Sequence, residues 1–349
     1  MSRRQSPSGS PAAASKRPTV QDVAREAGVS PSTVSRALHT RGYASPDVRE
    51  RVQQAAERIG YVLNHNARNL RSRTSTSIGV LISDLRNPFY ADLAAGIEEV
   101  LRAEGHQMML VNDNGDPAEE MRAAETLLAM RVPGVIVTPV TAACPRMLQE
   151  NGVHVVCADR EFPRQGVDVV LSDNKAGARE LTEHLIALGH TRIGLLIDET
   201  KWSTGAGRLA GFRAAHTAAG LDLDEGLVAF TSFDAEAARV TTRELLRAQA
   251  PTAIVSANNV LAQGALAELK DRRLKIPQRI SLAAYDDVPW MSLVQPALTT
   301  IDQHTVELGR SCARLLLARI RAELPAKRRI IRVPPRLIVR GSTGPAPTP

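Results

Sequence analysis

The sequence has few of the features that mark secreted, membrane or metal-binding proteins. Three cysteines occur among 349 residues, with no CxxC motif and no Cys/His ligand spacing, so neither a disulfide framework nor a metal site is expected. No apolar run approaches the roughly 18 residues that cross a bilayer, and the polar start lacks the apolar core of a secretion signal. We therefore expect a soluble cytoplasmic protein with no membrane contact.

The sequence also lacks the common catalytic motifs. It has no Walker A loop, no HExxH and no GxSxG, and its eight histidines are dispersed. The stretch 205–211 approaches a dinucleotide fingerprint, but its third glycine is one place late and no strand directly precedes it. We expect no cofactor and no enzymatic activity; an NAD-linked enzyme is the alternative that a cofactor titration would reveal.

Positive charge is concentrated near the N-terminus. Residues 1–77 contain 13 Lys/Arg and 5 Asp/Glu, whereas the remaining 272 residues contain 31 and 32. This distribution predicts a small basic module that meets a polyanion, followed by a larger part with balanced charge.

Short apolar runs alternate with amphipathic stretches beyond residue 77. Each run is rich in β-branched residues and precedes a helix-like segment such as 89–104 or 175–188. This alternation is typical of parallel sheets covered by helices on both faces. Because some 270 residues are many for one sheet, we expect two α/β lobes. The runs are 78–82, 108–111, 135–137, 153–157, 193–197, 253–256 and 281–285.

Helix start and stop signals define the N-terminal module. Thr19 and Asp22 form a potential capping box before an apolar stripe, and Gly28 ends that helix. Ser30 is then a predicted N-cap with Pro31 at the start of a second helix. Ser45 is the predicted cap of a third helix with the core stripe Val48, Val52, Ala55 and Ile59. Two short helices joined by a tight turn predict a helix-turn-helix, whose second helix enters the major groove.

The second helix carries the residues expected to meet DNA. Val34 and Ala37 face the core, which leaves Arg36 outward, where its guanidinium suits guanine. Thr33 and Ser35 suit phosphate oxygens. On spacing alone a solvated helical hairpin is an equal alternative, and the local charge favours DNA.

Residues 64–71 are too few to form an isolated helix in water. They could fold on DNA, with Leu70 as an apolar wedge in the minor groove and Arg68 and Arg71 near the backbone. An ordinary flexible linker is the alternative.

Several motifs resemble the lactose-repressor (LacI/GalR) family of bacterial transcription factors. They span roughly residues 19–341 in that family's order. The matching segments are Val20–Ser30, Ser32–Leu38, Arg49–Val52, Gly60-Tyr61, Ala67-Arg68, Leu70, Asn87-Pro88-Phe89, Ser172-Asp173-Asn174, Gly207–Phe212 and Pro296–Thr300.

The resemblance implies an N-terminal all-α helix-turn-helix head-piece with a hinge helix, followed by a two-lobed α/β domain like periplasmic binding proteins. It implies a homodimer on a pseudo-palindromic double-stranded operator, with no membrane partner; the absence of C-terminal heptads favours a dimer over a tetramer. The DNA-binding residues it implies are Thr19, Ser30, Pro31, Ser32, Thr33, Ser35, Arg36, His39, Asn64, Ala67, Arg68 and Leu70. Leu63, His39 and Asn259 depart from residues that are common in the family.

The expected domains follow from these signals and from the resemblance. They are a disordered basic arm (1–17), a helix-turn-helix domain (18–63), a hinge helix and linker (64–77), a two-lobed effector-binding and dimerisation domain (78–341) and a disordered tail (342–349). Lobe one is expected at about 78–172 plus 302–331, and lobe two at about 173–301 plus 332–341.

Ligands in open α/β sheets lie beyond the carboxyl ends of the strands. Aromatic, carboxylate and guanidinium side chains follow several of the apolar runs, and a polyol needs this mixture. The same positions resemble the sugar-contacting set of ribose-type binding proteins. The expected effector-binding residues are Asn87, Phe89, Tyr90, Asp159, Arg160, Thr204, Arg208, Phe233, Asn258, Asp286 and Gln303.

Some of these residues have simpler interpretations. Phe89 and Phe233 could be core aromatics, the Asp159-Arg160 pair could lie on the surface, and Asp286 could cap a helix. Trp202 could shape the pocket or lie on the surface. We predict a DNA-binding repressor of sugar-utilisation genes controlled by a small sugar; a purine or a phosphorylated metabolite is the alternative effector.

Overall fold

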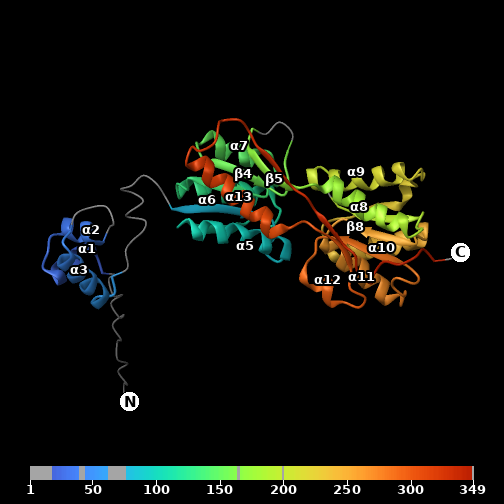
Figure 1. The fold of residues 1–349 in the computed structure, drawn as a ribbon, viewed down its shortest axis with the longest axis horizontal. Coiled ribbons are helices and arrows are strands. Elements are labelled where there is room, and N and C mark those ends of the chain that lie inside the picture. The colour runs from blue at the N-terminus through green and yellow to red at the C-terminus, as the bar shows by residue number, and fades with distance from the viewer. Residues whose placement is uncertain (1–17, 39–43, 62–75, 163–165, 199, 348–349) are drawn as a thin grey trace, which may run out of the picture. The chain divides into compact units, whose positions relative to one another are not determined.

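The computed structural model describes residues 18–38, 44–61, 76–162, 166–198 and 200–347. The chain divides into two compact units, residues 1–73 and 74–349 (Figure 1). The expected arm and hinge helix lie outside the described residues. So do the DNA-binding predictions for His39, Asn64, Ala67, Arg68 and Leu70.

The N-terminal unit contains the three predicted helices, α1 (Val20–Ala27), α2 (Pro31–Leu38) and α3 (Pro46–Arg58). The capping box of α1 is present: the Asp22 amide donates to Thr19 Oγ1 at 3.4 Å, and the Thr19 amide donates to the Asp22 carboxylate at 2.9 Å. Gly28 ends α1 with φ +62°, a conformation that glycine adopts without strain. Ser45 makes no side-chain cap, contrary to prediction, because the fixed φ of Pro46 already starts α3.

The core of this unit is a small apolar cluster between the three helices. Val23, Val34 and Val52 are fully buried, and Ala37 faces inward as predicted. The predicted stripe of the third helix is confirmed: Val52 and Ala55 lie in the cluster, and the half-buried Val48 and Ile59 pack against it. Ala56, which was not predicted, is also buried there.

Lobe one is a six-stranded sheet in the order β11-β5-β4-β3-β1-β2, and all neighbouring strands are parallel. Val, Ile and Leu fill its strands, as expected for a sheet buried on both faces. Its strands are β1 (Ser77–Ile82), β2 (Gln107–Asn112), β3 (Gly134–Val137), β4 (His154–Ala158), β5 (Asp168–Ser172) and β11 (Ile330–Val333), and its helices are α5 (Pro88–Ala103), α6 (Pro117–Ala129), α7 (Ala143–Glu150) and α13 (Thr305–Ile320).

Lobe two repeats this plan with the strand order β12-β10-β9-β8-β6-β7; only the edge strand β12 is antiparallel. Its strands are β6 (Ile193–Ile197), β7 (Val228–Phe230), β8 (Ala253–Ser256), β9 (Ser281–Tyr285), β10 (Thr299–Asp302) and β12 (Arg336–Ile338). Its helices are α8 (Asn174–Ala187), α9 (Ser203–Ala218), α10 (Ala235–Gln249), α11 (Asn259–Asp271), α12 (Pro289–Leu293) and the 3₁₀ turn η1 (Glu225–Leu227).

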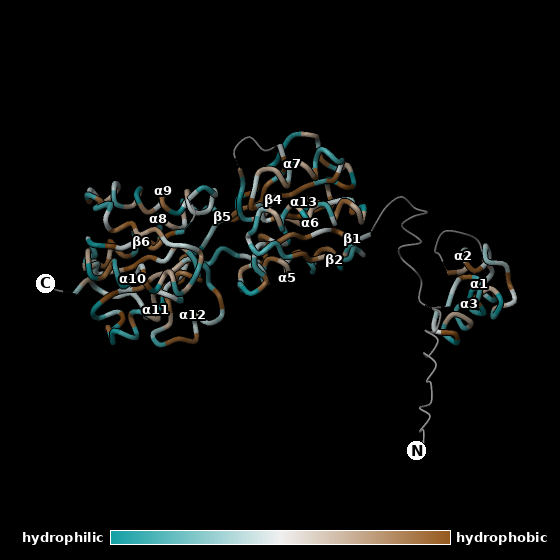
Figure 2. Tube along the Cα trace, turned by 180° about the vertical axis from the view of Figure 1, so that it is seen from behind, coloured by the Kyte–Doolittle hydropathy of each residue, from teal (hydrophilic) through white to brown (hydrophobic). Residues whose placement is uncertain are grey.

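The seven predicted apolar runs are all strands, and apolar residues concentrate inside each lobe (Figure 2). The chain passes between the lobes after β5, after β10 and between β11 and β12. The last passage lies slightly later than predicted, because β11 continues through Val333 on the edge of the first sheet.

The expected disordered tail is ordered over residues 342–347, which corrects the sequence prediction. Ser342 is fully buried; its hydroxyl accepts from the Thr299 amide at 2.8 Å and donates to the Leu282 carbonyl at 2.5 Å. The Ala346 amide donates to the Leu188 carbonyl at 2.9 Å. These side-chain and backbone hydrogen bonds hold the segment on lobe two, and its Pro/Gly-rich composition does not reveal them.

Candidate functional site: a pocket between the lobes

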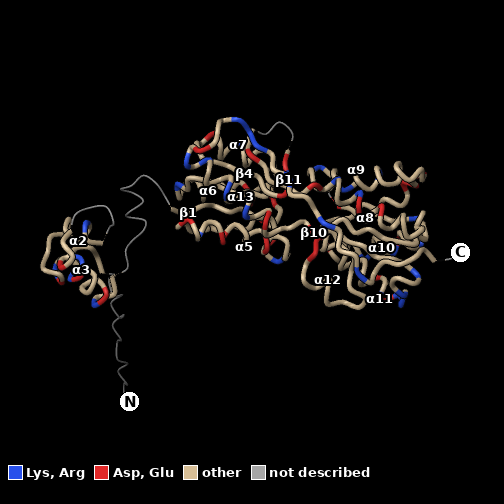
Figure 3. The backbone as a smooth tube through the Cα atoms, viewed as in Figure 1, with Lys and Arg blue, Asp and Glu red and all other residues tan. Residues whose placement is uncertain are grey.

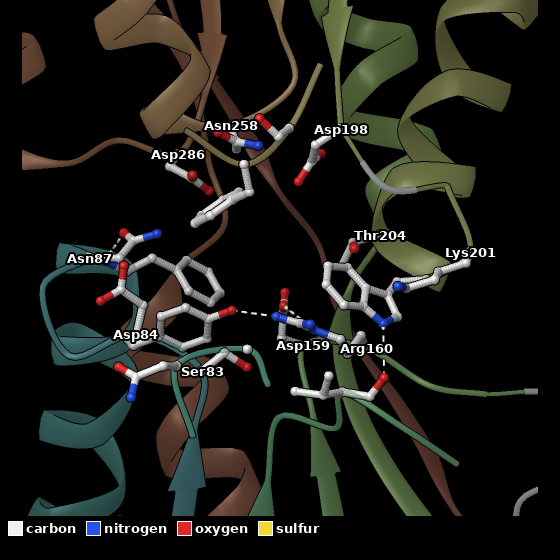
Figure 4. A pocket seen from close by; sticks show the side chains of 18 of the residues that line it. Ser83, Asp84, Asn87, Asp159, Arg160, Asp198, Lys201, Thr204, Asn258 and Asp286 are labelled. Carbon is white, nitrogen blue, oxygen red and sulfur yellow. Dashed lines mark hydrogen bonds and ion pairs between the residues drawn. The ribbon is translucent and has the colours of Figure 1, made fainter. Parts of the chain in front are cut away.

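A cavity of about 400 Å³ lies between the two lobes, where the carboxyl ends of their strands face each other (Figure 4). A volume of this size suits a small ligand. The structure brings all eleven predicted effector-binding residues to this one cavity: Asn87, Phe89, Tyr90, Asp159, Arg160, Thr204, Arg208, Phe233, Asn258, Asp286 and Gln303.

The first turn of α5 forms one wall of the pocket. Asn87 caps this helix, since its Oδ1 accepts from the Phe89 amide at 3.0 Å. The cap places two aromatic rings, Phe89 and Tyr90, edge to face with centroids 5.2 Å apart. Both rings are buried and also line the cavity, so the core and pocket interpretations of Phe89 hold together.

Asp159 and Arg160 follow β4 and form a buried ion pair with 3.6 Å between Oδ2 and Nε. Their side chains are 7% and 6% exposed, so the alternative of a surface pair was wrong. Asp159 has φ +67°, a left-handed conformation that aspartate tolerates better than bulky residues. The Arg160 guanidinium donates to the Tyr90 hydroxyl and packs against the ring of Trp202.

Burial shifts the pKa values of two ionisable side chains at this end of the pocket. It raises the pKa of Asp159, against the opposing effect of Arg160 and Arg208. It also raises the pKa of Tyr90 to about 12, although the nearby Arg160 favours the phenolate. Tyr90 therefore keeps its proton near neutral pH.

Arg208 belongs to the second turn of α9 and is held on three sides. Its Nε donates to Asn174 Oδ1 at 2.8 Å, its Nη1 donates to the Ala257 carbonyl at 2.5 Å, and its guanidinium carbon lies 4.1 Å from the centroid of the Tyr285 ring. These contacts fix one face of the guanidinium in the cavity.

Asp286 organises the opposite end of the pocket. Its Oδ2 accepts from the backbone and side-chain nitrogens of Asn259 at 3.0 and 2.8 Å, and its Oδ1 accepts from Gln303 Nε2 at 2.5 Å. It does not cap α12, whose N-cap is Val288. Asn259 also donates to Asn87 Oδ1 across the lobes at 3.0 Å. An aspartate at 259, common in the resembled family, would place a second carboxyl group beside Asp286.

Three predicted residues complete the pocket from lobe two. Asn258 caps α11 through the Leu261 amide at 2.9 Å, and Thr204 lies in the first turn of α9. Phe233 is 40% exposed, so it is not a core aromatic and presents its ring to the cavity and to solvent.

The sequence prediction missed about half of the lining. Many of the missed residues also follow strand ends, so the same rule could have found them; the Val140 position gives no signal, because its backbone carbonyl is the interacting group. Trp202, for which the sequence allowed a pocket or a surface position, is one of the lining residues. The additional lining residues are Ser83, Asp84, Arg86, Asn114, Gly115, Pro117, Val140, Asp198, Lys201, Trp202 and Ser232.

Within the described residues, the predicted DNA-contacting residues of the helical unit lie on α2 and its cap, except Thr19, which is exposed at the N-cap of α1. Pro31, Ser32 and Arg36 are exposed on α2, and Thr33 and Ser35 are half-buried. Ser30 caps α2 by accepting from the Thr33 amide at 3.2 Å, and its hydroxyl shares hydrogen bonds with Ser32 and Thr33.

No three His, Cys, Asp or Glu side chains within the described ranges group in a way that could hold a metal ion. No helix in the described part of the chain is long and apolar enough to cross a bilayer.

Residues 19–64 match the family model described as "Bacterial regulatory proteins, lacI family". Residues 75–339 match "Periplasmic binding proteins and sugar binding domain of LacI family". The HTH-type transcriptional regulator DegA of Bacillus subtilis (strain 168) is 32% identical over 335 residues, which cover 95% of this chain and 99% of DegA.

Two solved structures are also similar to this chain. A complex of the transcriptional regulator CelR with cellobiose has 32% identity and a TM-score of 0.72, over 93% of this chain and 100% of that one. The lac repressor dimer bound to operator and the anti-inducer ONPF has 28% identity and a TM-score of 0.84, over 94% of this chain and 100% of that one.

Proposed function

Because this chain belongs to the LacI family of bacterial regulatory proteins, we propose that it binds operator DNA under the control of a neutral sugar held between its lobes. The observation that carries this proposal is the set of eleven aromatic, carboxylate, amide, hydroxyl and guanidinium residues around one cavity. Such a set binds a polyol through stacking on its C–H faces and hydrogen bonds to its hydroxyls.

The charges of the pocket favour a neutral ligand. Among the described lining residues, four carboxylates are balanced by four cations, and both signs are interspersed over the lobes (Figure 3). A phosphorylated metabolite would approach the buried Asp159 and Asp286 with no net positive field to offset their repulsion. The sugar is therefore preferred to the phosphorylated alternative.

Buried polar atoms without hydrogen-bond partners in the described pocket favour a ligand that carries hydroxyl groups. Asp159 Oδ1 and Gln303 Oε1 are buried acceptors, and Arg160 Nε and Nη1 are buried donors; none has a hydrogen-bond partner among the described residues. Buried polar atoms are normally paired. A hydroxyl both donates and accepts, so a polyol can satisfy both kinds of atom, whereas phosphate oxygens only accept.

The relatives support the same class of ligand. The CelR complex contains cellobiose, and the ribose operon repressor of Escherichia coli (strain K12) is 32% identical over 93% of this chain. Purine repressors of Haemophilus influenzae are 30% identical over a similar length, so a purine is the second candidate. Asp159 and Arg160 stand at positions that resemble the sugar-contacting set of ribose-type binding proteins, and this resemblance favours the sugar.

For the DNA-binding half of the proposal, α2 enters the major groove with Arg36 directed at base edges, and Thr33 and Ser35 lie near phosphates. A homodimer would place two such helices on a pseudo-palindromic site, as expected for a protein similar to the operator-bound lac repressor dimer. The hinge around Leu70 stays a sequence prediction.

The proposed regulation is repression of sugar-utilisation genes, with the sugar changing the angle between the lobes and so the spacing of the two DNA-binding units. A coupling free energy of about 1–3 kcal/mol would change operator affinity about 5–150-fold. This role requires neither a cofactor nor catalysis, and it is carried out in the cytoplasm, where the DNA is.

A thermal-shift screen of the full chain tests the ligand class. The panel contains pentoses, hexoses, disaccharides, sugar phosphates, purines and NAD. A neutral sugar at about 100 times its Kd should add roughly 2.7 kcal/mol of stability and raise Tm by a few degrees. A shift with a sugar phosphate, a purine or NAD and with no neutral sugar would contradict the proposal.

A further inference from the structure

Trp202 crosses the cleft from lobe two to lobe one. It occupies the N-cap position of α9 but makes no side-chain cap, although Ser, Thr, Asp and Asn are the residues that normally serve there. Its indole Nε1 instead donates to the Val140 carbonyl of lobe one at 3.2 Å. Helix capping therefore does not explain a tryptophan at this position, whereas the hydrogen bond to lobe one does.

The same side chain contacts a ligand-facing cation. The Arg160 guanidinium carbon lies 4.2 Å from the Trp202 ring centroid, within cation–π range. Arg160 is 5% exposed and lines the cavity, and its Nε and Nη1 have no hydrogen-bond partner in the described part of the chain. Figure 4 shows Arg160 beside Asp159, with Thr204 and Lys201 on the lobe-two side.

A neighbouring contact strengthens this junction. Ser203 Oγ accepts from the Glu161 amide at 2.9 Å. Two consecutive residues of lobe two thus contact residues 140, 160 and 161 of lobe one. The other hydrogen bond described between opposing walls of the pocket, from Asn259 to Asn87 at 3.0 Å, lies at the Asp286 end and involves no cation.

We propose that Trp202 is a positioning residue that couples occupation of the Arg160 end of the pocket to closure of the two lobes. This inference rests on the proposed function, because it assigns a role within the same pocket. A ligand hydroxyl that accepts from Arg160 fixes the plane of the guanidinium. A fixed guanidinium is a better stacking partner for the indole, and the indole bonds to Val140 only when the lobes are together.

Two substitutions separate the two contacts of the indole. Trp202→Phe keeps a ring over Arg160 but removes the N–H donor to Val140. Trp202→Ala removes both contacts. Since a hydrogen bond and a cation–π contact each contribute modestly, we expect Trp202→Ala to weaken sugar affinity about tenfold, and Trp202→Phe to have an intermediate effect.

Lobe separation is the direct readout. Spin labels at Glu125→Cys on α6 and Ala218→Cys on α9, both exposed positions, report the distance between the lobes in the full chain by double electron–electron resonance. The native Cys144, Cys157 and Cys312 are buried, and burial raises the pKa of each thiol, so they react slowly with the label.

Without any sugar, Trp202→Ala should shift the distance distribution toward longer separations, with a smaller shift for Trp202→Phe. The matched control is Trp290→Phe, which changes the other tryptophan of the chain, outside the pocket lining, and should leave the distribution unchanged. An unchanged distribution for Trp202→Ala overturns the inference.

Measurements with D-ribose, D-glucose or cellobiose test whether ligand binding is coupled to closure through Trp202, and they do so separately from the sugar-free contact between the lobes. A sugar that narrows the wild-type distribution should narrow that of Trp202→Ala less, and equal narrowing in both proteins would contradict the coupling. If no sugar in the wider thermal-shift panel binds the wild-type chain, the proposed function fails, while the sugar-free comparison still decides the role of Trp202.

Discussion

Arg208 shows how single residues prepare the pocket. Its hydrogen bonds to Asn174 and Ala257 and its stacking on Tyr285 fix the guanidinium before a ligand is present. A ligand that meets a fixed group loses less entropy on binding than one that must order it. Asn174, Tyr285 and the Ala257 carbonyl therefore support the binding site, although none of these three residues lines the cavity.

Replacing Arg208 tests its role in binding. Arg208→Ala should weaken sugar affinity by about tenfold to a hundredfold, because hydrogen bonds to charged groups are among the stronger ones. Operator binding without sugar should stay unchanged. The control is Arg213→Ala, which removes an exposed arginine from the same helix. Calorimetric titration with the sugar found by thermal shift measures the effect, and equal affinity in both variants would remove Arg208 from the site.

Asp113 gives a residue-level prediction about pH. It is fully buried and directly precedes the lining residues Asn114 and Gly115. Its Oδ1 accepts from the Gly115 amide at 2.8 Å, and burial raises its pKa to about 7, with the nearby Glu120 adding to the rise. Between about pH 4 and pH 7 the folded chain holds a proton that the unfolded chain releases, so stability falls as pH rises through this window.

Asp113→Asn removes this titration and keeps an oxygen for the Gly115 amide. Relative to wild type, the variant should gain stability between pH 5 and pH 8. Urea unfolding at the two pH values measures the change, with the exposed Asp222→Asn as control. If wild type and Asp113→Asn differed by the same free energy of unfolding at both pH values, Asp113 would not be the group that titrates in this window.

At the level of elements, the ordered C-terminal segment stabilises lobe two. Ser342→Ala leaves the buried Thr299 amide without its acceptor, at a cost of about 1–3 kcal/mol. The control is Ser292→Ala, since that hydroxyl is exposed. Thermal unfolding should show a clearly lower Tm for Ser342→Ala and little change in Tm for Ser292→Ala. Equal Tm values for the two variants would contradict a stabilising role of the C-terminal segment.

The helix α2 carries the DNA-reading prediction. Arg36→Ala should reduce specific operator affinity by about 1–3 kcal/mol, the usual discrimination of a bidentate base contact. Arg25→Ala removes the same charge from an exposed position on α1. Affinities for operator and random DNA, measured at one salt concentration, separate the two effects; an equal, sequence-independent loss for both variants would exclude base reading by Arg36.

Local sequence signals predicted the helices and strands well where their formation depends on residues close together in the chain. Capping residues at Thr19 and Ser30 and β-branched runs such as 78–82 depend on near neighbours, and the structure has these elements. The order of residues 342–347 depends on strands some 40 to 60 positions earlier in the chain, so composition alone misjudged it.

The pocket residues likewise divide into those that a local sequence signal predicts and those that depend on distant parts of the chain. Side chains that follow strand ends could be identified because parallel strands end at one edge of a sheet. The Trp202–Val140 contact could not, because it joins an indole to a backbone carbonyl of the other lobe. Resemblance to a known family supplied Phe233 and Gln303, and both line the cavity.

On the scale of the whole molecule, the two lobes are joined by three strand-end passages and hold the pocket between them. A ligand that contacts both walls binds the closed arrangement more tightly, and this difference in affinity is what shifts the population. In the proposed dimer, the shift changes the spacing of the DNA-binding units and therefore operator affinity.

The most direct test measures operator affinity with and without the sugar that the thermal-shift screen identifies. The operator is first selected from random duplexes by the full chain, and its Kd is then measured by fluorescence anisotropy at fixed salt, because phosphate contacts make affinity salt-dependent. We predict a change of about 5–150-fold at saturating sugar, reduced or lost in Arg208→Ala. The same Kd with and without saturating sugar would contradict ligand-controlled DNA binding.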